Sequence, residues 1–323
     1  MRNSPDLSLI IPVYNEEGNL LPLYQRILAA IEIEITSFEI IFVNDGSSDS
    51  SIQIIQKIAE KDKRVHYMDL SRNFGHQVAV TAGLENCSGK KAIIMDADLQ
   101  DPPEIIPQLL QKAKEGFEVV YARRKSRKGE NFFKKITANF FYRILARITT
   151  IDIPLDTGDF RLIDKKVIDV LKQMPEQQKF LRGQIAWAGF NQGYIEFDRD
   201  PRHSGKTNYS LRKMIRFAFD GISSFSDLPL KIATISGFIC SGIAFLLILY
   251  TLHSRLILKD FEKGWASEML SILFIGGIQL IAIGIIGEYI SRISVNVKNR
   301  PLYVVKNSTT PTIQEKDSEK TDV

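Results

Sequence analysis

The stretch Ala92-Ile93-Ile94-Met95-Asp96-Ala97-Asp98 joins an apolar run to two carboxylates that lie one residue apart. We expect the apolar run to be a buried strand that ends at Asp96. Side chains two residues apart in an extended chain point the same way, so Asp96 and Asp98 can reach one cation. Two carboxylates with open positions suit Mg²⁺ or Mn²⁺ bound to a substrate diphosphate. Taken alone, the same pattern also fits a solvated acidic turn.

The sequence around this stretch alternates between two periodicities. Strand patterns occur at residues 7–13, 38–43, 65–69 and 92–95, and helical patterns at 20–31, 51–61 and 76–84. Such alternation predicts an α/β fold with a mostly parallel sheet and helices on both of its faces. Ligands of these sheets bind beyond the carboxyl ends of the strands.

Three acidic turns follow strands of the predicted sheet. They are Tyr14-Asn15-Glu16, Asn44-Asp45-Gly46 and Asp96-Ala97-Asp98. We expect them to converge on one edge, because the carboxyl ends of parallel strands lie together. Their convergence favours a metal and substrate site over a solvated turn.

Two later segments have apolar residues at helical spacing with lysines and arginines around them. They lie near residues 131–149 and 210–226. This pattern predicts amphipathic helices in a membrane interface, with cations directed toward lipid phosphates. Ordinary core-facing helices with solvated charges are the alternative.

Residues 232–253 and 269–290 are nearly uninterrupted apolar runs, each long enough to cross a bilayer. Basic residues precede the first run and follow the second, so we expect both termini to be cytoplasmic. Glycines along the runs allow close helix packing and could support a homo-oligomer. The predicted division is a cytosolic domain at 1–230, a membrane region at 231–291 and a cytosolic tail at 292–323, disordered from about 307.

Composition excludes several other classes of protein. The net charge is +4 without a long basic tract, which argues against a nucleic-acid partner. Cys87 and Cys240 are far apart, and we expect no disulfide. The four histidines, His76 among them, do not cluster and are expected to be surface or packing residues rather than zinc ligands. The first apolar run is short and contains Pro12, unlike a signal peptide.

Six motifs together resemble the family 2 glycosyltransferases of the GT-A fold, which is Rossmann-like. Within that family the chain is similar to the polyprenyl-phosphate glycosyltransferases, namely bactoprenol glucosyl transferases and, more distantly, dolichol-phosphate mannose synthases. The motifs are Ile11-Pro12-Val13-Tyr14-Asn15-Glu16-Glu17, Asn44-Asp45-Gly46-Ser47-Ser48-Asp49, Asp96-Ala97-Asp98-Leu99-Gln100-Asp101-Pro102-Pro103-Glu104, Thr157-Gly158-Asp159-Phe160-Arg161-Leu162, Phe180-Leu181-Arg182-Gly183 and Arg202-His203-Ser204-Gly205-Lys206-Thr207-Asn208-Tyr209.

The resemblance implies a set of site residues. Asp96 and Asp98 would bind the metal, Mg²⁺ or Mn²⁺. Asn44 replaces the first acid of the family's usual Asp-Asp-Gly-Ser turn, and Asn208 stands where the family often has a lysine, for which Lys206 is the substitute. The implied nucleotide-sugar-binding residues are Pro12, Tyr14, Glu16, Val43, Asp45, Asp96, Ala97, Asp98, Arg202 and Lys206.

By the same resemblance Asp159, together with Asp98, is a catalytic residue. A phosphate monoester has a second pKa of about 6 and is already nucleophilic at neutral pH. We therefore expect Asp159 to orient the acceptor, or to take a proton only from its monoanion; a helix-capping acid is the alternative. The acceptor's negative charge must also be offset. The basic residues expected to bind the acceptor phosphate are Arg123, Arg127, Lys134 and Lys135.

The function expected from these features is an inverting, metal-dependent transfer of a sugar from a UDP-sugar to undecaprenyl phosphate. The resemblance favours glucose as the sugar. The reaction would take place on the cytosolic side of the bacterial plasma membrane, among its lipids, and give a polyprenyl-phosphate sugar. A processive polysaccharide synthase, a nucleotide-binding membrane scaffold and a hydrolase of the same donor are the alternatives.

Overall fold

The computed structural model describes residues 4–32, 35, 37–124, 157–197, 228–253 and 264–310. The chain divides into two compact units. The first, the sheet unit, consists of Met1–Arg143, Ile151–Tyr209 and Pro301–Val323. The second, the helical unit, consists of Ile144–Thr150 and Ser210–Arg300.

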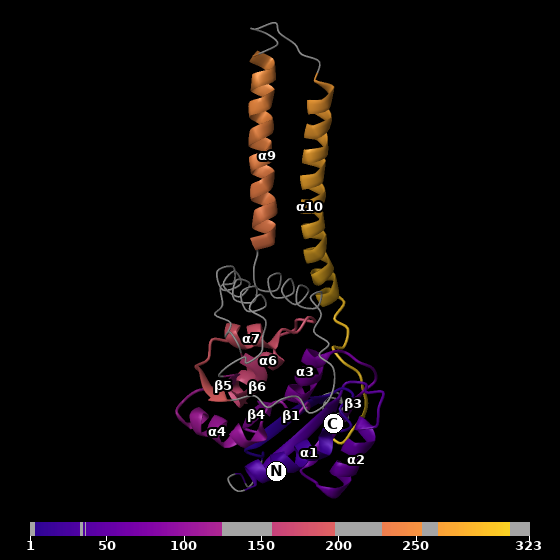
Figure 1. Ribbon diagram of the computed structural model, residues 1–323, viewed down its shortest axis with the longest axis vertical. Helices are drawn as coiled ribbons and strands as arrows, with labels where there is room; N and C mark the ends of the chain where they lie inside the picture. The colour runs from indigo at the N-terminus through magenta and orange to yellow at the C-terminus, as the bar shows by residue number, and fades with distance from the viewer. Residues whose placement is uncertain are drawn as a thin grey trace, which may run out of the picture. The chain divides into compact units, whose positions relative to one another are not determined.

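The sheet unit is built on one eight-stranded sheet of order β7-β5-β6-β4-β1-β2-β3-β8 (Figure 1). Its strands are β1 Leu7–Val13, β2 Phe38–Asn44, β3 Val65–Leu70, β4 Lys91–Ile94, β5 Val119–Arg124, β6 Thr157–Asp164, β7 Gln192–Phe197 and β8 Val305–Ser308. The four strands β4, β1, β2 and β3 run parallel, as do β5 and β7, whereas β6 and β8 run antiparallel to their neighbours. The predicted α/β fold with a mostly parallel sheet is confirmed.

Helices cover both faces of the sheet. They are α1 Leu20–Ile31, α2 Ser51–Lys61, α3 His76–Asn86, the short η1 Pro103–Ile105, α4 Ile106–Lys114, α6 Lys165–Lys172 and α7 Leu181–Trp187. Along β1, Leu9 and Ile11 pack into the hydrophobic layer shared with α1, α2 and α4, while Ile10 packs into the layer shared with α3, α6 and α7. Burial on both faces explains why the strand reads as a continuous apolar run.

The chain returns to the sheet near its C-terminus. β8 pairs with the edge strand β3, Ser71 N donates to Val304 O (2.9 Å), and Tyr67 N donates to Thr309 Oγ1 (2.9 Å). The expected start of disorder near residue 307 is therefore wrong for residues 307–310, which are ordered on β3. Polar composition did not indicate this strand, because an edge strand is held mainly by backbone hydrogen bonds and exposes its side chains.

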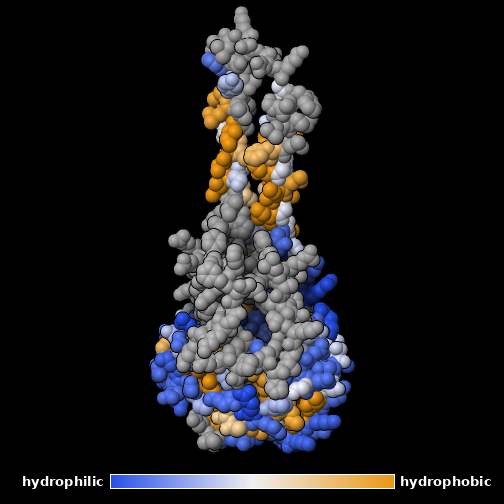
Figure 2. Space-filling view, in the orientation of Figure 1, coloured by the Kyte–Doolittle hydropathy of each residue, from blue (hydrophilic) through white to orange (hydrophobic). Residues whose placement is uncertain are grey.

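The helical unit contains α9 Leu228–His253 and α10 Trp265–Val297, which contact each other. Both expose large apolar side chains, including Phe238 and Leu280, and this apolar surface is visible in Figure 2. Within the described residues, one segment, Phe274–Val297, is long and apolar enough to cross a membrane, with a mean hydropathy of 1.6. The apolar runs 232–253 and 269–290 thus lie on helices, while the expected amphipathic helices at 131–149 and 210–226 lie outside the described residues.

Candidate active site

The first two acidic turns meet at the carboxyl ends of β1 and β2. Asn15 N donates to Ser47 Oγ (3.0 Å), and Ser48 N donates to Asn15 Oδ1 (2.8 Å). Gly46 has φ +67°, and a Cβ there would lie 2.5 Å from backbone atoms of Arg72 and Asn73. Glycine at this position therefore allows the turn after β2 to approach the loop after β3.

Asp45 joins the second turn to that loop. Its carboxylate accepts the backbone N–H of Phe74 (2.7 Å) and of Gly75 (2.9 Å). Burial raises the pKa of Asp45, although these two hydrogen bonds oppose the shift. The loop then leads directly into α3, whose first residue is His76. Asp45 therefore fixes the backbone that carries His76 into the site.

The third turn follows β4 and carries Asp96 and Asp98. Asp98 is largely buried, and its Oδ1 accepts the N–H of Gln100 (3.1 Å). Asp96 lies near His76, with 3.7 Å between Asp96 Oδ1 and His76 Nε2. Through the loop that Asp45 holds, and through His76, all three acidic turns belong to one site.

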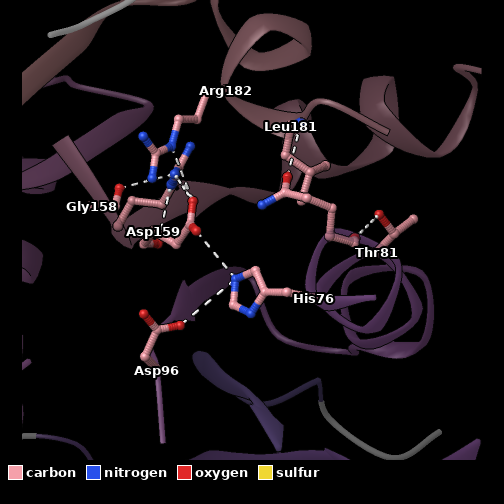
Figure 3. Close-up of polar contacts among 9 residues, drawn as sticks. His76, Thr81, Asp96, Gly158, Asp159, Leu181 and Arg182 are labelled. Atoms are coloured by element: carbon pink, nitrogen blue, oxygen red, sulfur yellow. Dashed lines mark hydrogen bonds and ion pairs between the residues drawn. The ribbon is translucent and has the colours of Figure 1, made fainter. Parts of the chain in front are cut away.

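Asp159 lies at the centre of a charged cluster on the neighbouring strand β6 (Figure 3). Its Oδ1 accepts from Arg161 Nη2 (2.7 Å) and from Arg182 Nε (3.2 Å), and its Oδ2 lies 3.2 Å from His76 Nε2. Arg161 is 1% exposed and also donates from Nη2 to Gly158 O (3.0 Å). Both oxygens of Asp159 are thus bound by cationic side chains.

The charges of this cluster shift the acid–base properties of its members. Burial would raise the pKa of Asp159, but Arg182, His76 and Arg161 hold it well below its usual range. Burial lowers the pKa of His76, yet the hydrogen bond to Asp159 and the charge of Asp96 outweigh this and raise it to about 9. Burial raises the pKa of Asp96, and the nearby Asp159 and Asp98 add to the shift against His76. Asp159 is therefore ionised and a weak base, and His76 is a cation at neutral pH.

Residues 8–171 match the family model described as "Glycosyl transferase family 2", and residues 228–293 match the family model described as "GtrB C-terminal hairpin". The chain belongs to glycosyl transferase family 2. Its sheet unit is a GT-A domain, and the hairpin match spans α9 and most of α10.

Curated relatives of this glycosyltransferase match nearly all of its length. It is 48% identical to an uncharacterized glycosyltransferase, YkcC, of Bacillus subtilis, with 93% of each chain covered. It is 38% identical to the SfII prophage-derived bactoprenol glucosyl transferase of Shigella flexneri, with 94% of this chain and 98% of the relative covered. A crystal structure of S. aureus TarS 1-349 aligns at 18% identity and a TM-score of 0.44, covering 60% of this chain and 59% of that one.

Several residues expected to bind the nucleotide sugar line the same edge of the glycosyltransferase sheet. Tyr14 is 50% exposed, and Glu16 Oε2 accepts from Asn19 Nδ2 (2.6 Å). Pro12 and Val43 are buried within β1 and β2, and Ala97 is buried in the turn after β4. The roles of these residues stay predictions. Arg202 and Lys206 lie outside the described residues.

Of the residues expected to bind the acceptor phosphate, only Arg123 falls in the described part of the chain. Its guanidinium stacks over the ring of Tyr194 at 5.0 Å from the centroid. Arg127, Lys134 and Lys135 lie outside the described residues. The acceptor-binding role of all four stays a prediction.

The sequence reasoning did not assign a role to three cations that the fold brings to Asp159. His76 was expected to be a surface or packing residue, whereas it contacts two acids of the site. Arg161 and Arg182 lie in motifs that carried the family resemblance, but no role followed from their spacing. An arginine two residues from an acid along one strand, as in Asp159-Phe160-Arg161, is the signal that could have indicated an ion pair.

The pair Asp96 and Asp98 fits a metal ion that is shared with a substrate. Within the described residues, no group of three or more His, Cys, Asp or Glu side chains could hold a metal by itself. A Mg²⁺ or Mn²⁺ bound by one or two carboxylates completes its coordination with substrate phosphates and water. Burial is the main cause of the raised pKa of Asp96, and the charges of Asp159 and Asp98 add to it; a bound cation would oppose this shift.

Proposed function

We propose that this glycosyltransferase transfers glucose from UDP-glucose to undecaprenyl phosphate, giving an undecaprenyl-phosphate glucose on the cytosolic side of the bacterial plasma membrane. Relatives named bactoprenol glucosyl transferase, 37–38% identical over most of the chain, support this acceptor and this sugar. The matched C-terminal hairpin and the apolar surface of α9 and α10 support a membrane-bound acceptor.

One structural observation supports the proposal most directly. Asp159 binds three cationic side chains and lies beside Asp96, which is one of the two metal-site acids. A transfer to an anionic acceptor needs acids that hold a metal at the leaving diphosphate and a fixed group that orients the acceptor. The contacts of His76 support the proposal because they bring Asp96 close to Asp159, the acid proposed to orient the acceptor.

On the donor side, Asp96 and Asp98 would hold Mg²⁺ or Mn²⁺, which would neutralise the diphosphate as it leaves. Asp45, with Pro12, Tyr14, Glu16 and Val43, would bind the nucleoside. Ala97 would line the same pocket, while Arg202 and Lys206 would bind the donor phosphates. Asp45 is buried, and its two carboxylate oxygens already accept backbone N–H groups of the loop after β3. A contact between Asp45 and the nucleoside would therefore replace these hydrogen bonds or add to them.

On the acceptor side, the phosphate oxygen attacks the anomeric carbon while the bond to the diphosphate oxygen breaks, which inverts the configuration. The acceptor dianion needs no base, since its second pKa is about 6. The low pKa of Asp159 supports an orienting role rather than proton transfer. Arg123, Arg127, Lys134 and Lys135 would offset the charge of the acceptor phosphate.

The test is an assay of the purified protein with a panel of UDP-sugars, undecaprenyl phosphate, and Mg²⁺ or Mn²⁺. We expect a lipid-linked product with UDP-glucose, no product after chelation of the metal, and a loss of at least about 100-fold in kcat for Asp98→Asn. Asp169→Asn, an exposed acid on α6 paired with Lys165, is the matched control. UDP release that needs no lipid would favour a hydrolase, and a growing polysaccharide would favour a processive synthase.

A further inference from the structure

His76 lies between two acids that belong to neighbouring strands. Asp96 lies two residues after the end of β4 and Asp159 lies in β6, and these strands pair with Ile94 opposite Arg161. The fold therefore brings the carboxylates of Asp96 and Asp159 close to each other, and their like charges repel. The His76 side chain contacts both, at 3.2 Å from Asp159 and 3.7 Å from Asp96 (Figure 3).

The position of His76 is fixed from two directions. On one side, Asp45 binds the N–H groups of Phe74 and Gly75, directly before α3. On the other side, Gln77 Oε1 accepts the N–H of Leu181 at the start of α7 (3.2 Å). The next residue of α7, Arg182, binds Asp159 itself. The imidazole is therefore held in place by the nucleotide side of the site and by the Asp159 cluster together.

We propose that His76 is a positioning residue for the transfer reaction: its imidazole, placed between Asp159 and Asp96, holds the two carboxylates in one arrangement. The inference rests on the proposed function. Arg161 and Arg182 bind one oxygen of Asp159 and His76 binds the other, so the carboxylate cannot rotate without losing a partner. Loss of His76 leaves Asp159 free to rotate away from Asp96 and toward the arginines.

The contact between His76 and Asp96, which should favour transfer, should weaken the binding of a metal cation. At Asp96 the imidazole occupies one side of a carboxylate that a divalent ion would also use. A side chain in contact with a carboxylate competes with a metal ion for that carboxylate. Removing His76 should therefore strengthen metal binding while it slows transfer, and a general loss of structure would weaken both.

The experiment compares His76→Gln, His76→Lys and the control His66→Gln in the full-length protein. His66 lies in β3, opposite Ile41, and has no part in the site. The measurements are kcat, the KM of each substrate, and the affinity for Mn²⁺ in the presence of UDP, read from the electron paramagnetic resonance signal of free Mn²⁺. Thermal unfolding of each variant monitors the fold.

For His76→Gln we expect kcat to fall about tenfold or more, with Mn²⁺ affinity about twofold to fivefold tighter, the range for a partly exposed ion pair. His76→Lys should recover part of kcat because its ammonium group can again contact both carboxylates, and His66→Gln should match the wild type. A His76→Gln enzyme with kcat within twofold of wild type overturns the proposal, as does unchanged or weaker Mn²⁺ binding. If the wild type and His66→Gln form no lipid-linked sugar, the proposed function fails, and the Mn²⁺ measurement still decides the role of His76.

Discussion

Asp159 lies at the centre of the charged cluster, and its contacts favour an orienting role over that of a general base. A general base needs a pKa near the working pH and a free lone pair directed at the proton. Asp159 has its pKa held well below the usual range and both oxygens bound by Arg161, Arg182 and His76. Its carboxylate also neutralises the guanidinium of Arg161, which is 1% exposed, and so contributes to stability.

We therefore expect Asp159→Asn to lower stability as well as activity. The substitution leaves the buried charge of Arg161 without its carboxylate, and breaking such a pair costs about 3–5 kcal/mol. Thermal or denaturant unfolding of the purified protein measures the loss. Asp169→Asn, at an exposed pair on α6, should change stability by less than about 0.5 kcal/mol. An Asp159→Asn protein as stable as the wild type would contradict the structural role assigned to this acid.

The residue scale also shows what the sequence could and could not predict about the site. Asp96, Asp98 and Asp45 were found because each lies in the turn that follows an apolar strand, and parallel topology brings strand ends together. His76, Arg161 and Arg182 were assigned no role because their meeting depends on how α3, β6 and α7 pack. The spacing of residues along the chain does not indicate which residues of separate helices and strands will come into contact.

At the scale of secondary-structure elements, the observed elements in the first half of the sheet unit agree closely with those predicted from the sequence. β1, α1 and α2 have the predicted bounds, because β1 is a continuous apolar run, α1 and α2 have helical periodicity, and turn residues separate the three elements. β8 was missed because only its pairing with the edge of β3 makes residues 305–308 a strand. Tyr303, whose hydroxyl donates to Glu85 Oε2 of α3 (2.8 Å), adds a tertiary contact that local sequence does not indicate.

The connection between α2 and β3 provides a pH-dependent contribution to stability. Hydrogen bonds from Arg64 outweigh the effect of burial and lower the pKa of Asp62 to about 2, and Tyr24 also donates to this acid (2.8 Å). The unfolded value is about 3.9. Since the folded pKa is the lower one, the stabilisation is complete above about pH 4 and is lost as the pH falls toward 2.

We expect Asp62→Asn to lower the free energy of unfolding by about 1 kcal/mol at pH 6, because Arg64 is partly exposed and its pairing is screened by solvent. The difference between wild type and variant should shrink as the pH falls from about 4 toward 2. Unfolding curves of both proteins at several pH values measure it. A difference that stays constant over this range would show that Asp62 acts through packing rather than charge.

At the scale of the whole molecule, the chain combines a GT-A unit with a pair of apolar helices. These helices expose more apolar surface than a soluble protein usually does; Phe238 and Leu280, for example, are 75% and 71% exposed. Basic residues flank the outer ends of the pair, with Lys231 near the start of α9 and Arg292, Lys298 and Arg300 near the end of α10. The positive-inside rule therefore predicts that these ends lie in the cytoplasm.

The last prediction concerns this topology. With Cys87 and Cys240 replaced by serine, Lys259→Cys, between α9 and α10, should react with a membrane-impermeant maleimide in right-side-out vesicles. Lys114→Cys, at the exposed end of α4, should react only in inverted vesicles, because its unit must share the compartment of the UDP-sugar. The two cysteines control for each other, since each vesicle type should label one and protect the other. Labelling of both from the same side would show that α9 and α10 do not form a two-span hairpin, and labelling in the reverse pattern would place the acids of the site away from their cytosolic donor.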